Sequence, residues 1–244
     1  MEKAEYFGNG AKLATGRYIE IMPELRKQGL APITPAMLMD RRIEAAKSKD
    51  KQLIEALWTN YFDTGYGFAA TKDSIYLHPN SGFLLNANPN TRLTQYGISI
   101  NKEEIDKSFK IIERKDHILN KSLTEKQASQ HKLWLELADN KQERLDSYVE
   151  QAFGLGRDEH SYNEMMRFYV PQDNEPILRA VYLGRLGNGS VAGGGRVLDN
   201  YSVRLVGVSE GGIGTVGSDN TKKFSALDLE RIAEQFNIKS EDEL

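Results

Sequence analysis

The chain of 244 residues contains no cysteine, which excludes disulfide bonds and thiolate metal sites. It also lacks an uninterrupted run of about 18 apolar residues, the length that a membrane-spanning helix needs, and residues 1–16 lack the apolar core of a signal peptide. The formal net charge of −3 gives no basis for the basic face that nucleic-acid binding requires. We therefore expect a protein of the cytoplasm or of a virus particle, with neither membrane nor nucleic acid as its partner.

The most informative absence is local. Residues 176–209, a stretch of 34, include no Lys, Glu, Gln, Met or Trp, although these five types make up 56 of the 244 residues. At that frequency a gap of this length has a chance of roughly one in ten thousand per window, and of about a few per cent over the whole chain. The composition of this stretch, called here the restricted segment, therefore needs a cause of its own.

The genetic code offers such a cause. Asparagine codons carry two adenines, and randomising both adenines yields every amino acid except Lys, Glu, Gln, Met and Trp. These are the types that the restricted segment lacks, while Gly, Asn, Arg, Tyr, Asp, Ser and Val are dense in it. Other residues of the segment look fixed and form a framework: Arg179, Ala180, Ser190, Ala192, Leu198 and residues 204–208.

This pattern resembles the variable region of proteins that diversity-generating retroelements diversify. In those systems an error-prone reverse transcriptase rewrites adenines of a target gene. The resemblance covers about 30 of the 244 residues and places the diversified part at residues 179–206. It implies a C-type-lectin-like fold that displays the rewritten residues and binds changing ligands with them. In that family the variable region lies at or near the C-terminus, whereas here 35 residues follow Ser209.

A site open to random substitution must not be needed for folding, because a domain has only a small margin of stability. We therefore expect variable positions to face solvent and to alternate with buried anchors along strands. The expected anchors are Val181, Leu183, Leu186, Ala192, Leu198, Val203, Leu205 and Val206. The expected ligand-contacting residues are Tyr182, Gly184, Arg185, Gly187, Asn188, Gly189, Val191, Gly195, Arg196, Asp199, Asn200 and Tyr201, a mixture typical of adaptable binding surfaces. The alternative is a plain antiparallel strand pair joined by a glycine-rich turn.

The first 62 residues are expected to be mainly helical. Residues 11–28 carry apolar side chains at helical spacing, and Pro23 is expected to bend or split that helix. Thr34 followed by Pro35 is typical of an N-cap with proline in the first helical position. A third helical run places Trp58 and Tyr61 three residues apart, and we interpret both as core contacts. Tyrosines elsewhere outside the restricted segment, such as Tyr66, Tyr76 and Tyr96, are interpreted as sheet or core residues.

From residue 63 the patterns change. Residues 66–71 and Ser74–His78 alternate and turn like a β-hairpin. Further elements expected are a capping-box helix after Thr124, an amphipathic helix ending at Gly154 and Gly156, strands at Ile177–Leu183 and residues 203–208, and a last helix from Ser225. We predict an α+β fold, with a helical N-terminal portion (1–62) and a ligand-binding domain (63–244) that has a small mixed or antiparallel β region. The two parts are expected to form one compact unit.

Other motifs indicate less. Gly212-x-Gly214-x-x-Gly217 has the form of a dinucleotide-binding fingerprint, but the sequence offers no opening helix or second strand after it, so we interpret it as a connector. The glycines from Gly187 onward resemble a phosphate cradle but lack the Gly-Lys-Ser/Thr ending of a P-loop. His160 with Asp158 and Glu159 is more typical of a solvated turn than of a metal or acid–base cluster.

Three functions are consistent with these patterns. The first is a binding protein without catalytic activity, cofactor or metal, whose residues in 179–206 bind a macromolecular ligand that we expect to be a protein. The second is an enzyme of unknown type, with its site in the glycine-rich C-terminal loops and His160 as the acid–base residue. The third is a structural subunit of a phage-like assembly. The restricted segment favours the first.

Overall fold

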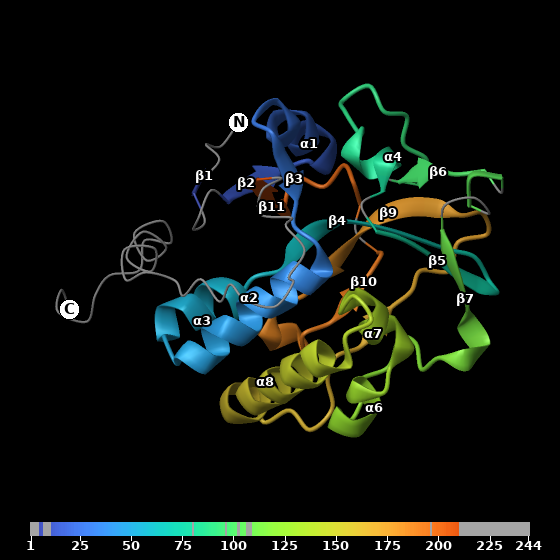
Figure 1. The fold of residues 1–244 in the computed structure, drawn as a ribbon. Helices are drawn as coiled ribbons and strands as arrows, with labels where there is room; N and C mark the ends of the chain where they lie inside the picture. Colours follow the sequence, from blue (N-terminus) through green and yellow to red (C-terminus); the bar gives the residue numbers. More distant parts are fainter. Residues whose placement is uncertain are drawn as a thin grey trace.

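The fold was analysed in a computed structural model, which describes residues 5–6, 11–79, 81–95, 97–101, 103–105, 109–195 and 197–209 (Figure 1). The helix expected from Ser225 and the glycine-rich loop at 211–217 lie outside these residues. The α-helices are α1 (Tyr18–Lys27), α2 (Pro35–Ser48), α3 (Lys51–Trp58), α4 (Gly82–Leu85), α6 (Glu125–Ser129), α7 (Lys132–Leu137) and α8 (Gln142–His160). The strands are β1 (Glu5–Tyr6), β2 (Lys12–Gly16), β3 (Leu30–Pro32), β4 (Phe62–Ala70), β5 (Ser74–His78), β6 (Ile98–Ser99), β7 (Lys110–Glu113), β8 (Phe168–Tyr169), β9 (Ile177–Leu183), β10 (Ala192–Gly193) and β11 (Val203–Ser209).

A mixed sheet forms the centre of the molecule. Its main path has the order β1-β2-β11-β4-β9-β10-β8, and β3, β5, β6 and β7 pair beside it. Strand β4 is antiparallel to β9 and parallel to β11. Because β4 lies between β9 and β11, these two strands do not pair with each other, and the interpretation of residues 177–208 as a simple strand pair with a turn is wrong.

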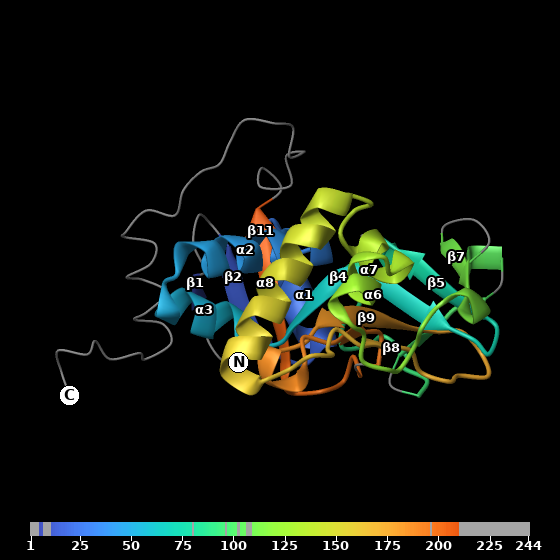
Figure 2. The same ribbon diagram turned by 90° about the horizontal axis from the view of Figure 1, so that it is seen from below.

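Helices cover both faces of this sheet, so that two cores form. The larger core packs α2, α3, α6, α7 and α8 against one face, and Figure 2 shows α6, α7 and α8 in front of the strands when the molecule is seen from below. The smaller core packs α1 and the α4 region against the opposite face. In β11, Val203 and Leu205 join the smaller core while Val206 and Val208 join the larger one, as the alternation of strand side chains requires.

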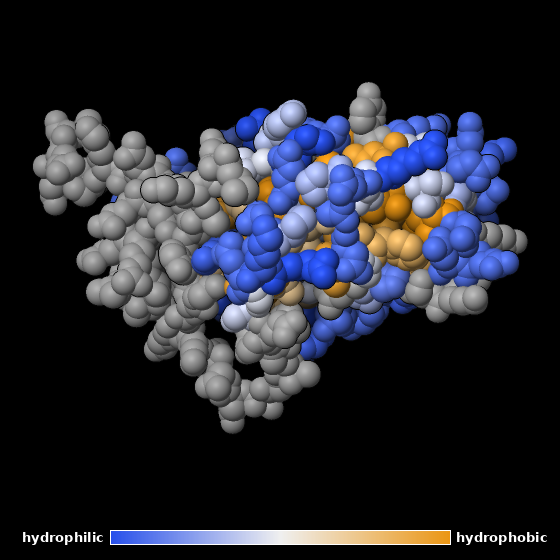
Figure 3. Space-filling model, turned by 90° about the horizontal axis from the view of Figure 1, so that it is seen from above, coloured by the Kyte–Doolittle hydropathy of each residue, from blue (hydrophilic) through white to orange (hydrophobic). Residues whose placement is uncertain are grey.

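The smaller core reaches the surface at its edge. Several of its apolar side chains are only partly buried, among them Phe83, Leu85, Leu93 and Ile98. Figure 3, the view from above, shows apolar surface between polar side chains on this side of the molecule. None of the helices in the described ranges is long and apolar enough to cross a membrane.

Local sequence signals predicted several elements correctly. Strands β4 and β5 form the expected hairpin, with Phe68 opposite Leu77. The Thr34 hydroxyl accepts a hydrogen bond from the Met37 amide at 3.2 Å, with Pro35 at the start of α2. Thr124 and Gln127 form a complete capping box at α6. Each of these signals depends on residues that are close in the sequence. In each case the tertiary contacts of the fold are compatible with the local structure.

Two local expectations were wrong, and one of the two effects expected of Pro23 is not found. Residues 12–16 form β2, because they pair with β11 in the sheet, and pairing of this kind overrides helical spacing. Pro23 lies inside α1 and does not split it, while the other expected effect, a bend at Pro23, stays a prediction. Helix α8 does not stop at Gly154 and Gly156 but continues to His160. Gly156 instead allows a close approach, since a Cβ there would lie 2.8 Å from the Met165 Sδ.

The first 62 residues contribute strands as well as helices. Strands β2 and β3 both pair with β11, and the expected boundary at residue 63 falls within β4. The N-terminal portion therefore contains part of the central sheet beside α1, α2 and α3. The division of the chain into two portions within one compact unit stays a prediction.

A histidine pair lies where α7 begins. His131 is 6% exposed, its ring stacks on Phe168, and its ring centroid is 5.8 Å from that of His117. His131 Nε2 donates a hydrogen bond to the Ile118 carbonyl oxygen at 2.9 Å, while Nδ1 is buried and has no partner among the described residues. Burial lowers the pKa of His131, the Ile118 bond opposes this shift, and the charge of His117 adds to it.

We expect the protein to lose stability as the pH falls through about 6.5, the ordinary pKa of histidine. Folding lowers the pKa of His131, so below that pH the unfolded chain binds more protons than the folded one. The urea midpoint should fall between pH 7.5 and pH 5.5, and His131→Gln, which keeps a donor for Ile118, should reduce this fall. The matched control is His160→Gln at the exposed end of α8, and an equal pH dependence in both variants would contradict the assignment to His131.

Candidate ligand-binding surface

Residues 184–202, called here the connecting segment, join β9 to β11 across the sheet. Buried side chains hold this segment and the two strands in place. All the expected anchors are buried, with exposed fractions of 1% or less: Val181, Leu183, Leu186, Ala192, Leu198, Val203, Leu205 and Val206. The apolar framework of the restricted segment therefore faces the two cores.

A polar network ties the middle of the connecting segment to the larger core. The hydroxyl of Ser190, which is fully buried, lies 3.1 Å from the Tyr148 Oη on α8. Tyr148 Oη accepts a hydrogen bond from Arg42 Nη1 at 2.9 Å, and Arg42 is itself fully buried on α2. Ser190 also adopts a positive φ of 48°. Both the hydroxyl bond and the positive φ restrict which residues position 190 can accept, as expected of a framework residue.

A second anchor precedes the connecting segment. Arg179 Nη1 on β9 lies 2.5 Å from Asp173 Oδ2, and the exposed fractions of the two side chains are 7% and 10%. Arg179 Nη2 donates a further bond to the Gln95 carbonyl oxygen. Because a buried charge without its partner is costly, this pair belongs to the framework rather than to a variable surface.

Most residues expected to contact ligand do face solvent, at least in part. The exposed or half-buried ones are Tyr182, Arg185, Gly187, Asn188, Gly189, Val191, Gly195, Asp199, Asn200 and Tyr201. Gly184 is buried, so its expected exposure was wrong: a Cβ there would lie 2.7 Å from Val191 Cγ2 and 2.9 Å from the Val191 carbonyl oxygen. Arg196 lies outside the described residues. Ligand contact by these positions stays a prediction.

The exposed positions do not alternate along strands as expected. Strands β9 and β11 are buried on both faces because helices cover both sides of the sheet, and of the expected contact residues only Tyr182 lies on either strand. The exposed residues instead gather in the connecting segment. The candidate surface is therefore a loop surface on a rigid sheet, a common arrangement for binding sites.

Some of these exposed residues also have structural contacts. The Asp199 carboxylate pairs with the Arg17 guanidinium, which also lies 5.4 Å from the centre of the Tyr201 ring. The Asn200 Oδ1 accepts hydrogen bonds from the Ser202 amide and hydroxyl, at 2.9 and 2.7 Å. Tyr201 is nevertheless 74% exposed. Substitution at 199 or 200 therefore changes local contacts as well as the surface.

A pocket of about 290 Å³ opens on the connecting segment. Its lining residues are Tyr61, Tyr169, Tyr182, Gly184, Arg185, Asn188, Val191, Gly195, Val197 and Asn200. Seven of these are expected contact residues, whereas Gly187, Gly189, Asp199 and Tyr201 do not line it. We call this cavity the tyrosine pocket.

Sequence reasoning missed two walls of the tyrosine pocket. Tyr61 was interpreted as a core contact beside Trp58, but α3 ends at Trp58, and only Trp58 is fully buried. Tyr169 was grouped with the sheet and core tyrosines, yet it is 43% exposed because its neighbour Phe168 takes the inward position of β8. The alternation of Phe168 and Tyr169 was the only local signal for an outward Tyr169.

Comparison with known proteins identifies the fold. No family model matches the sequence, and no curated protein matches it. A solved structure concerned with the accommodation of massive sequence variation in Nanoarchaeota by the C-type lectin fold does match, with a TM-score of 0.55 and 15% sequence identity. The match covers 82% of this chain and 97% of the other. The fold is C-type-lectin-like.

Local contacts describe the surroundings of two remaining motifs, the glycine-rich turn and His160. The amides of Asn188, Gly189 and Ser190 donate hydrogen bonds to the carbonyl oxygens of Arg185 and Leu186, so these amides are not available to cradle a phosphate. His160 Nε2 lies 3.9 Å from the Glu159 carboxylate on the last turn of α8. Within the described ranges, no cluster of three or more His, Asp or Glu side chains could hold a metal ion.

Proposed function

We propose that this protein binds ligands through surface residues of 179–206 that a retroelement diversifies, so that the surface meets changing macromolecular targets. We expect these targets to be proteins and the binding to need no catalysis. The observation that carries the proposal is the division within one short segment between buried, bonded framework residues and solvent-facing residues. This is the division that random rewriting of one set of codons requires.

Three further observations support the proposal. The restricted segment lacks the amino acids that rewritten asparagine codons cannot encode. The fold is similar to one that accommodates massive sequence variation in a Nanoarchaeota protein. Several of the exposed residues line a pocket, where part of a ligand can be enclosed. The expected location in the cytoplasm or on a virus particle stays part of the proposal.

A pair of libraries tests it. In one library, positions 185, 188 and 201 (Arg185, Asn188 and Tyr201) are each encoded by an asparagine codon whose two adenines are randomised. In the other library, Leu186, Ser190 and Ala192 are replaced by the same randomised codons. We expect most members of the first library to stay protease-resistant on a display surface, and most members of the second to be cleaved, because the first set is solvent-facing and the second is buried.

The first library should also yield binders when it is selected against several unrelated proteins. Equal loss of folded members from both libraries, or no binder to any of the proteins, would contradict the proposal. The gene offers an independent check. A near-copy of the codons for residues 179–206, differing mainly at adenines and lying near a reverse-transcriptase gene, is the expected finding.

A further inference from the structure

The tyrosine pocket has two kinds of wall. Tyr61 precedes β4 and Tyr169 lies on β8, so both are outside residues 179–206. Arg185, Asn188 and Asn200 belong to the connecting segment and are among the positions expected to vary. Diversification would therefore leave the two scaffold tyrosines in place and change the polar groups around them.

The charged group that the structure describes in the lining of the pocket is positive. Arg185 contributes a guanidinium, and none of the lining residues that the structure describes is Asp or Glu. Arg185 is exposed, and its guanidinium has no hydrogen-bond or ion-pair partner among the described residues. The adjacent acid, Asp199, has its carboxylate paired with Arg17. Among the described residues, the pocket therefore presents a cation whose charge no acidic lining residue offsets.

The remaining polar groups suit an anion as well. The Tyr169 hydroxyl and the side-chain amides of Asn188 and Asn200 include donors, whereas the Tyr61 hydroxyl donates to the Ser202 carbonyl oxygen. An arginine fork matches the two oxygens of a carboxylate. The volume of about 290 Å³ lies just below the range of about 300–1,000 Å³ that is typical of pockets for small-molecule ligands. A single inserted side chain fits this volume better than a larger free ligand.

We propose that the tyrosine pocket takes the carboxylate side chain of an Asp or Glu from a protein ligand, with Arg185 as the residue that selects the negative charge. This inference rests on the proposed function and names the ligand chemistry of this variant. Tyr61 and Tyr169 give the pocket its shape in every variant, while residue 185 sets the charge it accepts. A variant with an acidic residue at 185 would accept a basic side chain.

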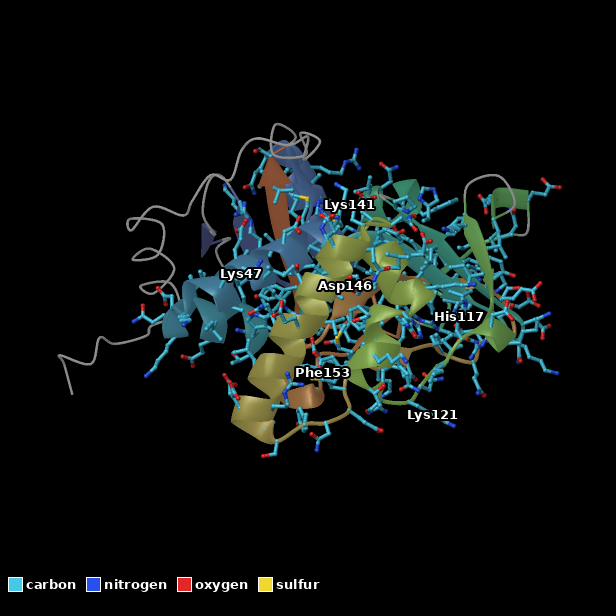
Figure 4. The ribbon with its side chains drawn as sticks, turned by 60° about the horizontal axis from the view of Figure 1, so that its bottom comes forward. Lys47, His117, Lys121, Lys141, Asp146 and Phe153 are labelled. Carbon is cyan, nitrogen blue, oxygen red and sulfur yellow. The ribbon has the colours of Figure 1, made fainter. Side chains whose placement is uncertain are left out.

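The test uses a phage-displayed library of random peptides, selected in parallel on the full chain and on Arg185→Glu. Lys141→Glu is the matched control, because it changes the net charge equally from an exposed position at the start of α8 (Figure 4). Lys141 is also far from the connecting segment along α8. The end of this 19-residue helix that lies near the segment is the opposite one, about 28 Å away, where the His160 ring lies beside Gly187.

The unchanged chain and Lys141→Glu should both enrich peptides with Asp or Glu at one shared position. Replacing that residue by Asn or Gln in a selected peptide should weaken binding at least about 10-fold, as should Arg185→Glu, because a charge-assisted bond is lost. Selection on Arg185→Glu should enrich Lys or Arg instead. Higher salt should weaken binding of the acidic peptides.

Two results would overturn the inference in distinguishable ways. Peptides that perturb amide resonances of residues 182–200 but show no acidic preference, or that bind Arg185→Glu as well as the unchanged chain, would reject the carboxylate and leave the proposed function standing. A library that yields no peptide bound to this surface would reject both.

Discussion

Arg42→Ala should lower the free energy of unfolding by about 4 kcal/mol or more, a large part of the total stability of a domain. Arg42 is fully buried, and its guanidinium donates to the carbonyl oxygens of Leu57 and Asn60 and to Tyr148 Oη, at 2.9–3.0 Å. Alanine would leave these buried acceptors without their donor and would open a cavity beside Trp58, on which the guanidinium stacks. Urea denaturation followed by circular dichroism measures the loss.

Arg41→Ala is the control on the same helix. Arg41 pairs with Glu44 near the surface of α2, and a surface pair of this kind is worth at most about 1 kcal/mol. If Arg42→Ala does not fold at all, Arg42→Lys gives a graded measurement, since lysine keeps the charge but not the fork of donors. Losses of similar size in the Arg42 and Arg41 variants would show that the buried network contributes little.

Gly194→Ala should cost about 3 kcal/mol, because a Cβ at this position would overlap the Phe68 ring. Phe68 is fully buried on β4, with its ring centroid 6.0 Å from that of Phe168, so the ring cannot move without repacking the core. The change should appear as a lower urea midpoint with an unchanged denaturant slope, the sign of a less stable but equally cooperative fold.

Gly187→Ala is the matched control in the same segment. Its Cβ would meet His160 at 3.7 Å, an ordinary van der Waals distance, and the residue is exposed. We expect a change of at most about 0.5 kcal/mol there. Both glycines are residues that a rewritten asparagine codon can encode. The pair therefore compares Gly194, which is buried and outside the expected contact set, with Gly187, which is exposed and within it. Equal costs at 187 and 194 would contradict the division between framework and variable positions.

The sequence was sufficient wherever a few neighbouring residues decide the structure. Thr34 with Pro35 and Thr124 with Gln127 cap their helices through contacts three residues apart, so both caps were predictable. The anchors of the restricted segment were predictable too, because apolar residues among polar ones are buried in almost any α+β arrangement. The C-type-lectin-like fold entered only through the resemblance of the restricted segment, and the structural comparison supports it.

Other features depend on partners distant in the sequence. Residues 12–16 form a strand that pairs along its whole length with β11, almost 200 residues later, as well as with the short β1. The tyrosine pocket joins Tyr61, Tyr169 and Tyr182 from three distant parts of the chain, and no spacing in the sequence indicates that they meet. The bond between Tyr148 and Ser190 likewise links α8 to the connecting segment. These contacts follow from the order of the strands, which the sequence pattern did not reveal.

The close spacing of the buried anchors limits how this surface can evolve. Leu186, Ser190 and Ala192 lie within seven consecutive residues, and each occupies its own place in the core. One inserted or deleted residue between them would shift a polar side chain into an apolar site and pull an anchor out of it. The connecting segment can therefore accept substitutions at many positions, but its length must stay constant. A process that exchanges bases without adding or removing codons keeps each anchor at its buried position. A process that joins gene fragments of varying length would displace the anchors and unfold the protein.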